Sequence, residues 1–410
     1  MDVVFLAPFG FSSKNTTGRR LLPIARSFVA EGHRARVIVP PYDEPSLYGE
    51  SWVDSGVEVC CVNRPKFMGQ SLPAQMWTQY RLAQASAKLV DEWAPDLVHI
   101  FKPKAVSGLA QLLISLRSKR PGIVLDLDDW EGRGGWSANE DYSRLLVEIF
   151  DIQERVGMRR CDAFTVASRK LEHRAINLAE GRDVMHIPNG FDQSAYADWN
   201  LDKASAERDV FRGSMGLGPV DHLVLIYTRF FDYDVDSWVE LICSIAASSG
   251  PVKFLVLGAG KFGQEASLSN AMKDRGLSSR VMFMGWTQFE TLPSFLSASD
   301  VALMPMADNL ANQAKCSPRF VDLMYAGVPV VTTPVGEAST FITDGLTGYV
   351  AESDRPDEVA VAVLRALADG ERDAIRKQAY RRVRKELSWS SLTVSLLDLY
   401  ERAVKRAGMV

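Results

Sequence analysis

The chain has 410 residues, of which 47% are hydrophobic and 24% charged, so it is long enough for two globular domains with separate cores. Its formal net charge of -4 argues against a general nucleic-acid-binding protein. The five cysteines show no metal-ligand spacing, and no apolar run approaches the roughly 20 residues of a membrane-spanning helix. The start, M-D-V-V-F-L-A-P, is interpreted as a first strand rather than a secretory leader, so we expect a cytoplasmic protein with reduced thiols.

Apolar segments that fit buried strands alternate with amphipathic segments, an order typical of parallel α/β domains. In the first half the predicted strands are residues 3–8, 35–40, 57–62, 97–101, 123–127, 163–167 and 184–187. A polar stretch without strands, residues 192–219, is predicted to be an interdomain linker. The alternation then restarts, with predicted strands at residues 223–228, 253–257, 281–284, 301–305, 328–333 and 348–350.

Two such sheets in tandem predict an α/β protein with two Rossmann-like, doubly wound domains that face a cleft. Ligands of open parallel sheets bind at the carboxyl ends of the strands, so the cleft is the expected site. We place the N-terminal domain at residues 1–195, the C-terminal domain at residues 196–385 and a final helical segment at residues 386–410.

Residues 315–337 read K-C-S-P-R-F-V-D-L-M-Y-A-G-V-P-V-V-T-T-P-V-G-E and predict a loop, a helix, a glycine turn and a buried strand. Ser317 fits the N-cap, Pro318 the first helical position and Gly327 the residue that ends the helix. The free N–H groups and positive dipole end of such a helix suit a phosphate, and Asp322, one turn on, suits sugar hydroxyls. An ordinary helix–strand unit is the alternative interpretation.

The segment L-D-L-D-D-W-E-G-R-G-G-W follows a predicted strand end, where functional loops lie. Asp128, Asp129 and Glu131 are suited to bind sugar hydroxyls, and Trp130 and Trp136 are suited to stack on a sugar ring. A glycine-rich turn with hydrated carboxylates is the alternative interpretation.

The run D-L-M-Y-A-G-V-P-V-V resembles the donor-binding signature of family 4 retaining glycosyltransferases of the GT-B fold, in which an E-x7-E motif precedes A-M-A-x-G-x-P-V-V. Asp322 stands at the position of the second glutamate and Ala314 at that of the first. Matching segments follow one another in the family's order along nearly the whole chain. The resemblance implies a GT-B fold in which the last helix crosses back onto the first domain.

In the first half, S-S-K-N-T-T-G-R-R is similar to the family's glycine loop. This implies that Gly18 approaches the donor phosphates while Arg19 and Arg20 add positive charge. His33, in the turn after the next predicted helix, is interpreted as structural.

D-L-V-H-I-F-K-P-K is similar to the family's loop near the acceptor, with Phe101 in place of the usual second histidine. Lys102 or Lys104 is therefore expected to contact an anionic ligand instead, whereas His99 is interpreted as a satisfied core residue. We take Lys102, Asp128 and Trp130 as candidate acceptor-binding residues and Asp129 as a candidate catalytic carboxylate.

In the second half, L-V-L-I-Y-T-R-F-F-D-Y-D-V-D is similar to the opening of the family's donor domain, which has G-R-x4-K. Arg229 matches the arginine that neutralises the donor diphosphate, a role that suits a guanidinium. Asp234 replaces the lysine, and Lys315 is expected to restore the lost charge.

The remaining matches also imply contacts with the donor nucleotide. F-L-V-L-G-A-G-K supplies Gly258, and M-F-M-G-W supplies a turn, Gly285 and Trp286, whose backbone is expected to read the base. Ser317, Pro318, Arg319 and Asp322 complete the candidate donor site.

The resemblance implies a retaining glycosyltransferase that moves a hexose from a nucleoside-diphosphate sugar to a hydroxyl of a glycolipid, polysaccharide or small molecule. A UDP-sugar is favoured, with GDP- and ADP-sugars as alternatives. No metal or other cofactor is expected, because arginine, lysine and a helix dipole stabilise the leaving diphosphate. Peripheral contact with the inner face of a membrane is compatible with the sequence, and the oligomeric state is open.

Two other functions remain open. A catalytically weakened GT-B protein that binds a ligand or partner is favoured by the departures at Ala314, Asp234 and Phe101. A nucleotide-sugar epimerase or phosphorylase on the same fold is the other.

Overall fold

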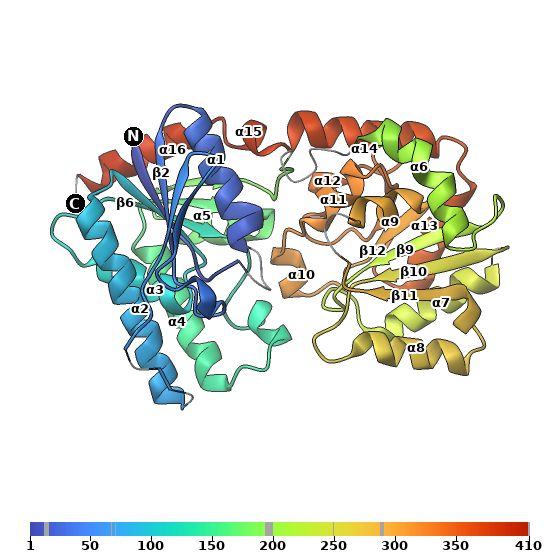
Figure 1. Ribbon diagram of the computed structural model, residues 1–410, viewed down its shortest axis with the longest axis horizontal. Helices are drawn as coiled ribbons and strands as arrows, with labels where there is room; N and C mark the ends of the chain where they lie inside the picture. The colour runs from blue at the N-terminus through green and yellow to red at the C-terminus, as the bar shows by residue number, and fades with distance from the viewer. Residues whose placement is uncertain are drawn as a thin grey trace. The chain divides into compact units, whose positions relative to one another are not determined.

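A computed structural model describes residues 1–11, 16–66, 68–69, 71–192, 200–248, 250–287 and 291–408. The chain forms two compact units, and Figure 1 labels many of their elements. The first unit comprises Met1–Gly190, Ala314–Cys316 and Trp389–Val410, and the second comprises Phe191–Gln313 and Ser317–Ser388.

The first unit is built on an eight-stranded sheet in the order β3-β4-β2-β1-β5-β6-β7-β8, within the part of the chain described. Its strands pair in parallel apart from the antiparallel β3–β4 edge. The bounds are β1 (Asp2–Leu6), β2 (Arg34–Val39), β3 (Ser51–Asp54), β4 (Val57–Cys61), β5 (Leu97–Phe101), β6 (Gly122–Leu127), β7 (Ala163–Val166) and β8 (Asp183–His186). The predicted strands of this half are confirmed to within two residues at each end, and β3 lies outside the prediction.

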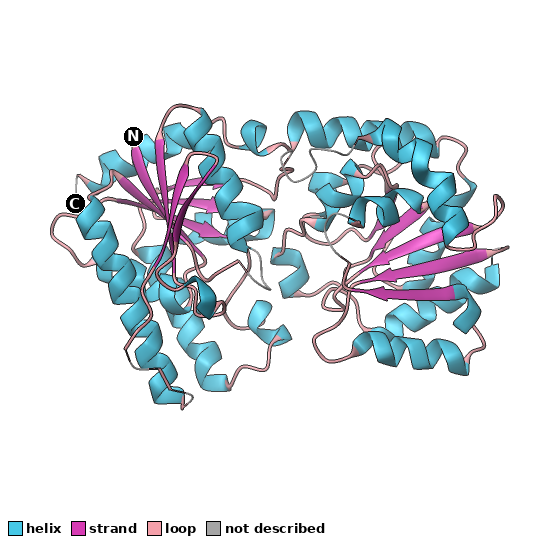
Figure 2. Cartoon of the chain, viewed as in Figure 1, coloured by secondary structure: helices cyan, strands magenta, loops and turns pink. Residues whose placement is uncertain are grey.

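Helices cover both faces of this sheet (Figure 2). One face packs against α1 (Leu22–Ala30), α15 (Trp389–Leu392) and α16 (Leu396–Ala407). The other packs against α2 (Leu72–Trp93), α3 (Ala105–Ser115), α4 (Arg144–Arg159) and α5 (Arg169–Leu178). Short helical turns lie at η1 (Thr17–Leu21), η2 (Pro45–Leu47) and η3 (Trp136–Asn139). The strands are apolar on both sides because both faces are covered.

The second unit is built on a parallel six-stranded sheet in the order β11-β10-β9-β12-β13-β14, again among the residues described. The bounds are β9 (His222–Tyr227), β10 (Val252–Leu257), β11 (Val281–Gly285), β12 (Val301–Met304), β13 (Val330–Thr332) and β14 (Tyr349–Val350). The first strand of the unit lies in the middle of the sheet, which is the Rossmann order. The predicted two Rossmann-like domains are thereby confirmed.

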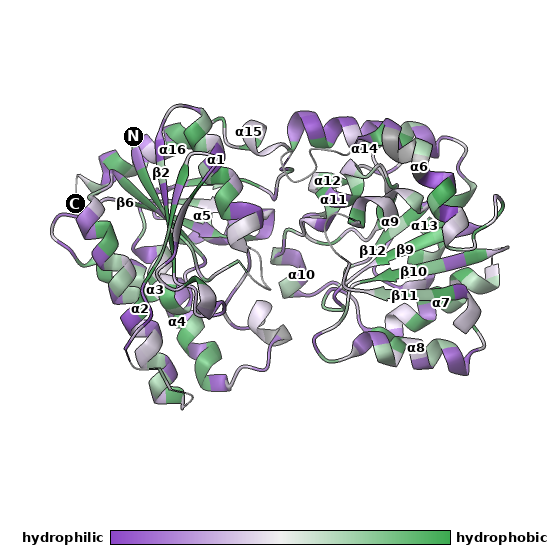
Figure 3. Cartoon of the chain, viewed as in Figure 1, coloured by the Kyte–Doolittle hydropathy of each residue, from purple (hydrophilic) through white to green (hydrophobic). Residues whose placement is uncertain are grey.

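The helices of the second unit surround this sheet, whose strands are green for hydrophobic residues in Figure 3 while the outer helix α14 is largely purple. Their bounds are α6 (Leu201–Ser214), α7 (Val235–Ser248), α8 (Gln264–Asp274), α9 (Leu292–Ala298), α10 (Leu310–Ala314), α11 (Arg319–Tyr325), α12 (Ala338–Phe341), α13 (Pro356–Ala368) and α14 (Arg372–Glu386), with a short turn η5 (Ser278–Arg280). Trp238 of α7 and Val363 of α13 belong to the core on one face.

The predicted linker over residues 192–219 is wrong for the part described, because most of it is helix α6. Arg208 and Arg212 of this helix bind the two carboxylate oxygens of Asp300, at 2.5 and 3.1 Å. Phe211 packs edge-on against Phe295, with ring centroids 5.0 Å apart. The polar composition thus reflects a helix held by ion pairs rather than an exposed connection.

The last helix belongs to the first unit, as the resemblance implies. Tyr400 of α16 is fully buried, and its hydroxyl lies 2.7 Å from Nδ1 of His99 on β5. His99 is a satisfied core residue, since its Nε2 also lies 2.9 Å from Thr165 Oγ1. Burial lowers the pKa of His99 to about 3. Within the described residues, no helix is both long and apolar enough to span a membrane.

Candidate functional site

Each sheet has a topological switch point, where the loops after two neighbouring strands diverge and leave a crevice for ligands. In the first unit this point lies between β1 and β5, which lead to Phe9 and Lys102. In the second unit it lies between β9 and β12, and the loop after β9 carries Arg229.

Lys102, directly after β5, is surrounded by carboxylates from the loop after β6. Its Nζ lies 3.0 Å from Asp128 Oδ1, 2.5 Å from Asp129 Oδ2 and 3.2 Å from Glu131 Oε1. Lys104 Nζ binds the other oxygen of Glu131 at 2.7 Å. The candidate residues Lys102, Asp128 and Asp129 are thus brought together, but Lys102 is neutralised by the protein itself. The expected contact of Lys102 or Lys104 with an anionic ligand is therefore not supported.

Burial and mutual attraction give the members of this cluster different pKa values. Burial, with help from neighbouring carboxylates and against the effect of Lys102, raises the pKa of Asp128 to about 7. Burial also opposes ionisation of Glu131, but the two lysines outweigh it and lower its pKa to about 2. The same carboxylates outweigh burial at Lys102 and raise its pKa well above the ordinary value. Asp128, unlike Glu131, therefore exchanges a proton near neutral pH.

The three carboxylates also lie close enough together to hold a metal ion. The Lys102 ammonium lies within 3.2 Å of an oxygen of each of them and supplies positive charge among them. A metal ion would therefore have to displace the lysine. The position of the lysine therefore does not favour a metal site.

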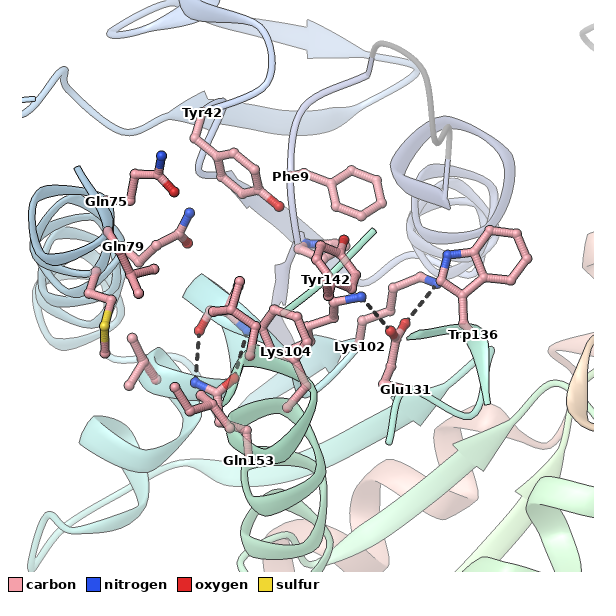
Figure 4. A pocket seen from close by; sticks show the side chains of 18 residues that line it. Phe9, Tyr42, Gln75, Gln79, Lys102, Lys104, Glu131, Trp136, Tyr142 and Gln153 are labelled. Atoms are coloured by element: carbon pink, nitrogen blue, oxygen red, sulfur yellow. Dashed lines mark hydrogen bonds and ion pairs between the residues drawn. The ribbon is translucent and has the colours of Figure 1, made fainter. Parts of the chain in front are cut away.

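A cavity of about 290 Å³ adjoins this cluster. Figure 4 shows Lys102, Glu131 and Trp136 on one side of it, Gln75 and Gln79 of α2 on another, and Lys104 and Tyr142 between them. The remainder of the wall is mostly apolar and comprises Pro8, Phe9, Tyr42, Leu72, Met76, Ala105, Leu109, Leu146, Ile149 and Phe150, with Gln153. Sequence reasoning missed this cavity because its walls come from separate helices and loops that form no local motif.

The two tryptophans of the predicted sugar-stacking pair have different surroundings. The guanidinium of Arg174 lies 3.6 Å from the ring centroid of Trp130 and covers one face of that ring. Trp136 lines the cavity, and Lys315 Nζ lies 5.4 Å from its ring centroid. Trp136 is therefore better placed than Trp130 to meet a ligand.

The predicted glycine loop differs from the structure. Residues 12–15 of it lie outside the described residues, and Gly18 and Arg19 lie in the helical turn η1. Arg20 is buried and binds both oxygens of Asp126, at 2.9 and 2.7 Å. The expectation that Arg20 adds charge for a phosphate is wrong, because its charge is used inside the first unit.

In the second unit, Arg229 follows β9 at the switch point. Its guanidinium lies 5.6 Å from the ring centroids of both Phe231 and Trp286. Trp286 is 70% exposed and follows Gly285 at the end of β11, so it offers a ring face near the arginine. Gly258, at the end of β10, has a φ of +104°, and a Cβ there would lie 2.1 Å from the oxygen of Thr228. Only glycine fits this close approach.

The predicted phosphate helix begins later than expected. The helix is α11, and its N-cap is Pro318 rather than Ser317. Arg319 donates to the backbone oxygen of Tyr227 at 2.6 Å and pairs with Asp232. Asp322 is buried in the first turn. Arg319 thus braces the end of β9, while Ser317, Pro318 and Asp322 remain predicted donor contacts.

The structure explains the three departures from the family pattern. Ala314 is fully buried in the core of the first unit, where a glutamate would bury a carboxylate among apolar side chains. Asp234 accepts from Ser237 N at 2.8 Å and so caps helix α7. Phe101 is buried against His99, with ring centroids 4.5 Å apart.

Two family models match the chain along most of its length: a glycosyl transferase 4-like domain over residues 15–190 and a glycosyl transferases group 1 domain over residues 223–369. An uncharacterised glycosyltransferase of Methanocaldococcus jannaschii is 24% identical over 394 residues, covering 94% of each chain. Two solved structures share the fold. Sucrose-phosphate synthase of Thermosynechococcus elongatus has a TM-score of 0.73 at 16% identity, covering 98% of this chain and 99% of that one. The Anabaena protein HepE, in complex with UDP and glucose, has a TM-score of 0.68 at 18% identity, with the same coverage.

Proposed function

The chain belongs to the group 1 glycosyltransferases with the GT-B fold, and on that premise we propose that it transfers a hexose from a nucleoside-diphosphate sugar to a hydroxyl group with retention of configuration. A UDP-sugar is the favoured donor, which is supported by the complex of the structurally similar HepE with UDP and glucose. The proposal needs neither a metal ion nor another cofactor.

The observation that carries the proposal is the position of Arg229. Its charge lies at the carboxyl end of β9, at the switch point of a sheet with Rossmann order, where ligands of such sheets bind. A guanidinium there can stabilise the negative charge that develops on a departing diphosphate, and the exposed ring of Trp286 can stack on a base.

The ion cluster of the first unit is suited to handle the acceptor hydroxyl. Asp128 exchanges a proton near neutral pH, and Lys102 holds it beside Asp129. Either carboxylate can accept a hydrogen bond from a hydroxyl and orient its oxygen for attack.

A binding screen followed by a transfer assay tests the proposal. Melting temperature is measured with UDP, GDP, ADP and their sugars, since a ligand of the folded state raises it. Release of free nucleoside diphosphate is then measured with and without candidate acceptors, and the anomeric configuration of the product is read by NMR. Binding without acceptor-dependent release would contradict transfer, and an inverted product would contradict retention.

A second function is favoured by the three departures from the family pattern. Ala314, Asp234 and Phe101 each have a structural role, so these three positions do not supply the groups that the family uses there. A GT-B protein weakened in this way would bind a nucleotide sugar without turning it over. The same assay separates the two functions, because the binding protein gives a thermal shift but no product.

A further inference from the structure

The apolar part of the cavity is formed by the N-terminal halves of α2 and α4. Leu72 and Met76 line it from α2, and Leu146 and Ile149 line it from α4. Its volume of about 290 Å³ is that of a small ligand site. Binding of a hydrocarbon group between such walls is favourable, because apolar surface is removed from water. Binding of sugar hydroxyls there is not favourable, because they would lose their hydrogen bonds to water.

This apolar lining continues onto the protein surface. Leu72 and Met76 line the cavity, yet they are 40% and 47% exposed. Trp77, next to Met76, and Leu145, next to Leu146, are also exposed. An exposed apolar surface that leads into a cavity marks an interaction site. We name Leu72, Met76, Trp77 and Leu145 the apolar ridge.

Basic side chains lie on α2, which carries most of the apolar ridge, and in the segment just before it. Arg81 places its guanidinium 6.0 Å from the ring centroid of Trp77. Arg64 and Lys66 lie in the segment that precedes α2 and, with Met68, line a shallow surface hollow. Tryptophan, aliphatic side chains and cations together suit the interface of an anionic lipid bilayer. A freely dissolved aromatic acceptor would need the cavity walls but neither the ridge nor the cations.

The other side of the cavity is polar. Lys102, Lys104 and Glu131 line it there (Figure 4), and Lys104 Nζ lies 4.9 Å from the ring centroid of Tyr142. The side-chain oxygen of Gln79, another lining residue, is buried and has no hydrogen-bond partner among the residues that the structure describes. That oxygen can accept a hydrogen bond from a hydroxyl of an occupant. The cavity therefore matches an amphiphile, with a hydroxyl-bearing end and a hydrocarbon end.

We propose that the cavity binds a hydrocarbon chain of a membrane lipid that bears the acceptor hydroxyl, while the apolar ridge rests on the bilayer surface. The hydrocarbon chain lies between α2 and α4, and the hydroxyl end of the lipid lies toward Glu131 and Trp136. The acceptor role of this lipid rests on the proposed function. Binding of its hydrocarbon chain in the cavity does not.

Binding of a fluorescent chain tests the cavity. Full-length protein is titrated with 11-(dansylamino)undecanoic acid, whose emission rises in apolar surroundings. Ile149→Trp fills the cavity and should weaken binding at least tenfold. Ile152→Trp is the matched control, because Ile152 lies on the same helix, is exposed and does not line the cavity. Leu146→Trp is a second filling variant, and circular dichroism checks that each variant is folded.

Displacement of the probe identifies the occupant. Linear alcohols from hexanol to dodecanol should displace it, with about fourfold tighter binding for each added methylene until the cavity is full. Displacement by 1-naphthol but not by these alcohols would assign the cavity to an aromatic compound. Absence of saturable probe binding, or equal binding by folded Ile149→Trp, would also overturn the proposal.

Vesicle sedimentation tests the ridge. Wild type should sediment with vesicles of phosphatidylcholine and phosphatidylglycerol at 3:1, and Met76→Asp should reduce the bound fraction at least fivefold. Leu116→Asp is the control, since Leu116 is exposed but lies outside the ridge and the cavity. No sedimentation of wild type, or equal sedimentation of Met76→Asp, would contradict a membrane lipid.

UDP binding by Ile149→Trp distinguishes this inference from the proposed function. The variant should keep wild-type UDP affinity, because Arg229 and Trp286 belong to the second unit. If wild type binds UDP but not the probe, the proposed site for a hydrocarbon chain is refuted and the proposed donor is not. Absence of UDP binding with intact probe binding would refute the proposed donor alone.

Discussion

Arg229 is the residue on which the proposed transfer chemistry depends most. Arg229→Ala should lower kcat/KM by roughly 10²–10³, the effect of losing a preorganised charge stabiliser. Arg275→Ala is the matched control, because Arg275 lies in the same unit, at the end of α8, and donates only to the Ala271 oxygen in the described structure. Steady-state kinetics on both variants decides the role, and a loss under threefold in folded Arg229→Ala would exclude it.

Asp322 has two possible roles that one pair of variants can separate. If its carboxylate accepts hydrogen bonds from the ribose, Asp322→Ala should weaken UDP binding by about 1.5–3 kcal/mol and Asp322→Asn by less. If it only supports α11, where it is buried, both variants should lower stability with little change in affinity. Calorimetric titration with UDP, together with urea unfolding, gives both quantities for each variant.

Single residues were predictable where their role is local. His99 is an example, since it sits inside a strand and is a satisfied core residue. The position of Arg229 after a strand end was also predictable, whereas its role at the donor diphosphate stays a prediction. Arg20 was not predictable, because its partner Asp126 is 106 positions away and only the sheet brings them together. The surroundings of Lys102 and Trp130 were not predictable for the same reason, since the loop after β6 supplies the carboxylates around Lys102 and helix α5 supplies the arginine that covers Trp130. Their roles toward the acceptor stay predictions.

At the scale of elements, the contact between the ends of β9 and β10 depends on Gly258. In Gly258→Ala the new Cβ overlaps the Thr228 oxygen, which should cost about 1–3 kcal/mol of stability in addition to about 1 kcal/mol for the positive φ. Gly276→Ala also has a positive φ, of +70°, but meets no atom within 4 Å, so only the smaller loss applies. Urea unfolding of the two variants measures the difference, and equal losses would contradict the close approach.

The loops after β5 and β6 are joined by the Lys102 ammonium. Lys102→Met should destabilise the first unit by about 3–5 kcal/mol, because it leaves buried carboxylates without their countercharge. Adding Asp128→Asn and Asp129→Asn should restore part of this loss. Lys88→Met is the control, since Lys88 pairs with Glu92 on the surface of α2, and it should change stability little. Destabilisation of similar size in the control would argue against the buried cluster.

Elements with a strong hydrophobic pattern were predictable, and those set by partners were not. The buried strands follow from their apolar runs, whereas β3 is short, alternates between exposed and half-buried residues, and forms an edge only through pairing with β4. Helix α6 was missed because its ion pairs with Asp300 are invisible in the sequence.

At the scale of the molecule, the alternation of strands and helices was sufficient to predict two Rossmann-like domains, because right-handed crossovers leave few ways to order parallel strands. The return of the last helix to the first unit came from the family resemblance. The cavity needed the structure, since α2, α3, α4 and the loops after β1, β2, β5 and β6 meet there without a shared motif.

The pH dependence of stability in the first unit tests its buried titratable groups together. His99 has a lowered pKa of about 3, so the unfolded chain takes up a proton first as pH falls below 6.5, and stability is lost between 6.5 and 3. Asp128 acts in the opposite direction. Its raised pKa of about 7 means that the unfolded chain releases a proton first as pH rises above 3.8, and stability is lost between 3.8 and 7.

The two effects oppose each other between about pH 4 and 6.5, so wild type should show a shallow profile there, with a further loss below pH 4.5 as Glu131 protonates in the unfolded chain. His99→Gln should then become less stable as pH rises through this window, and Asp128→Asn should become more stable, each by a few kcal/mol at most. Because a chain of two units need not unfold in one step, hydrogen exchange of β5 and β6 amides should accompany urea unfolding. Parallel profiles for the two variants would show that neither group titrates as its burial implies.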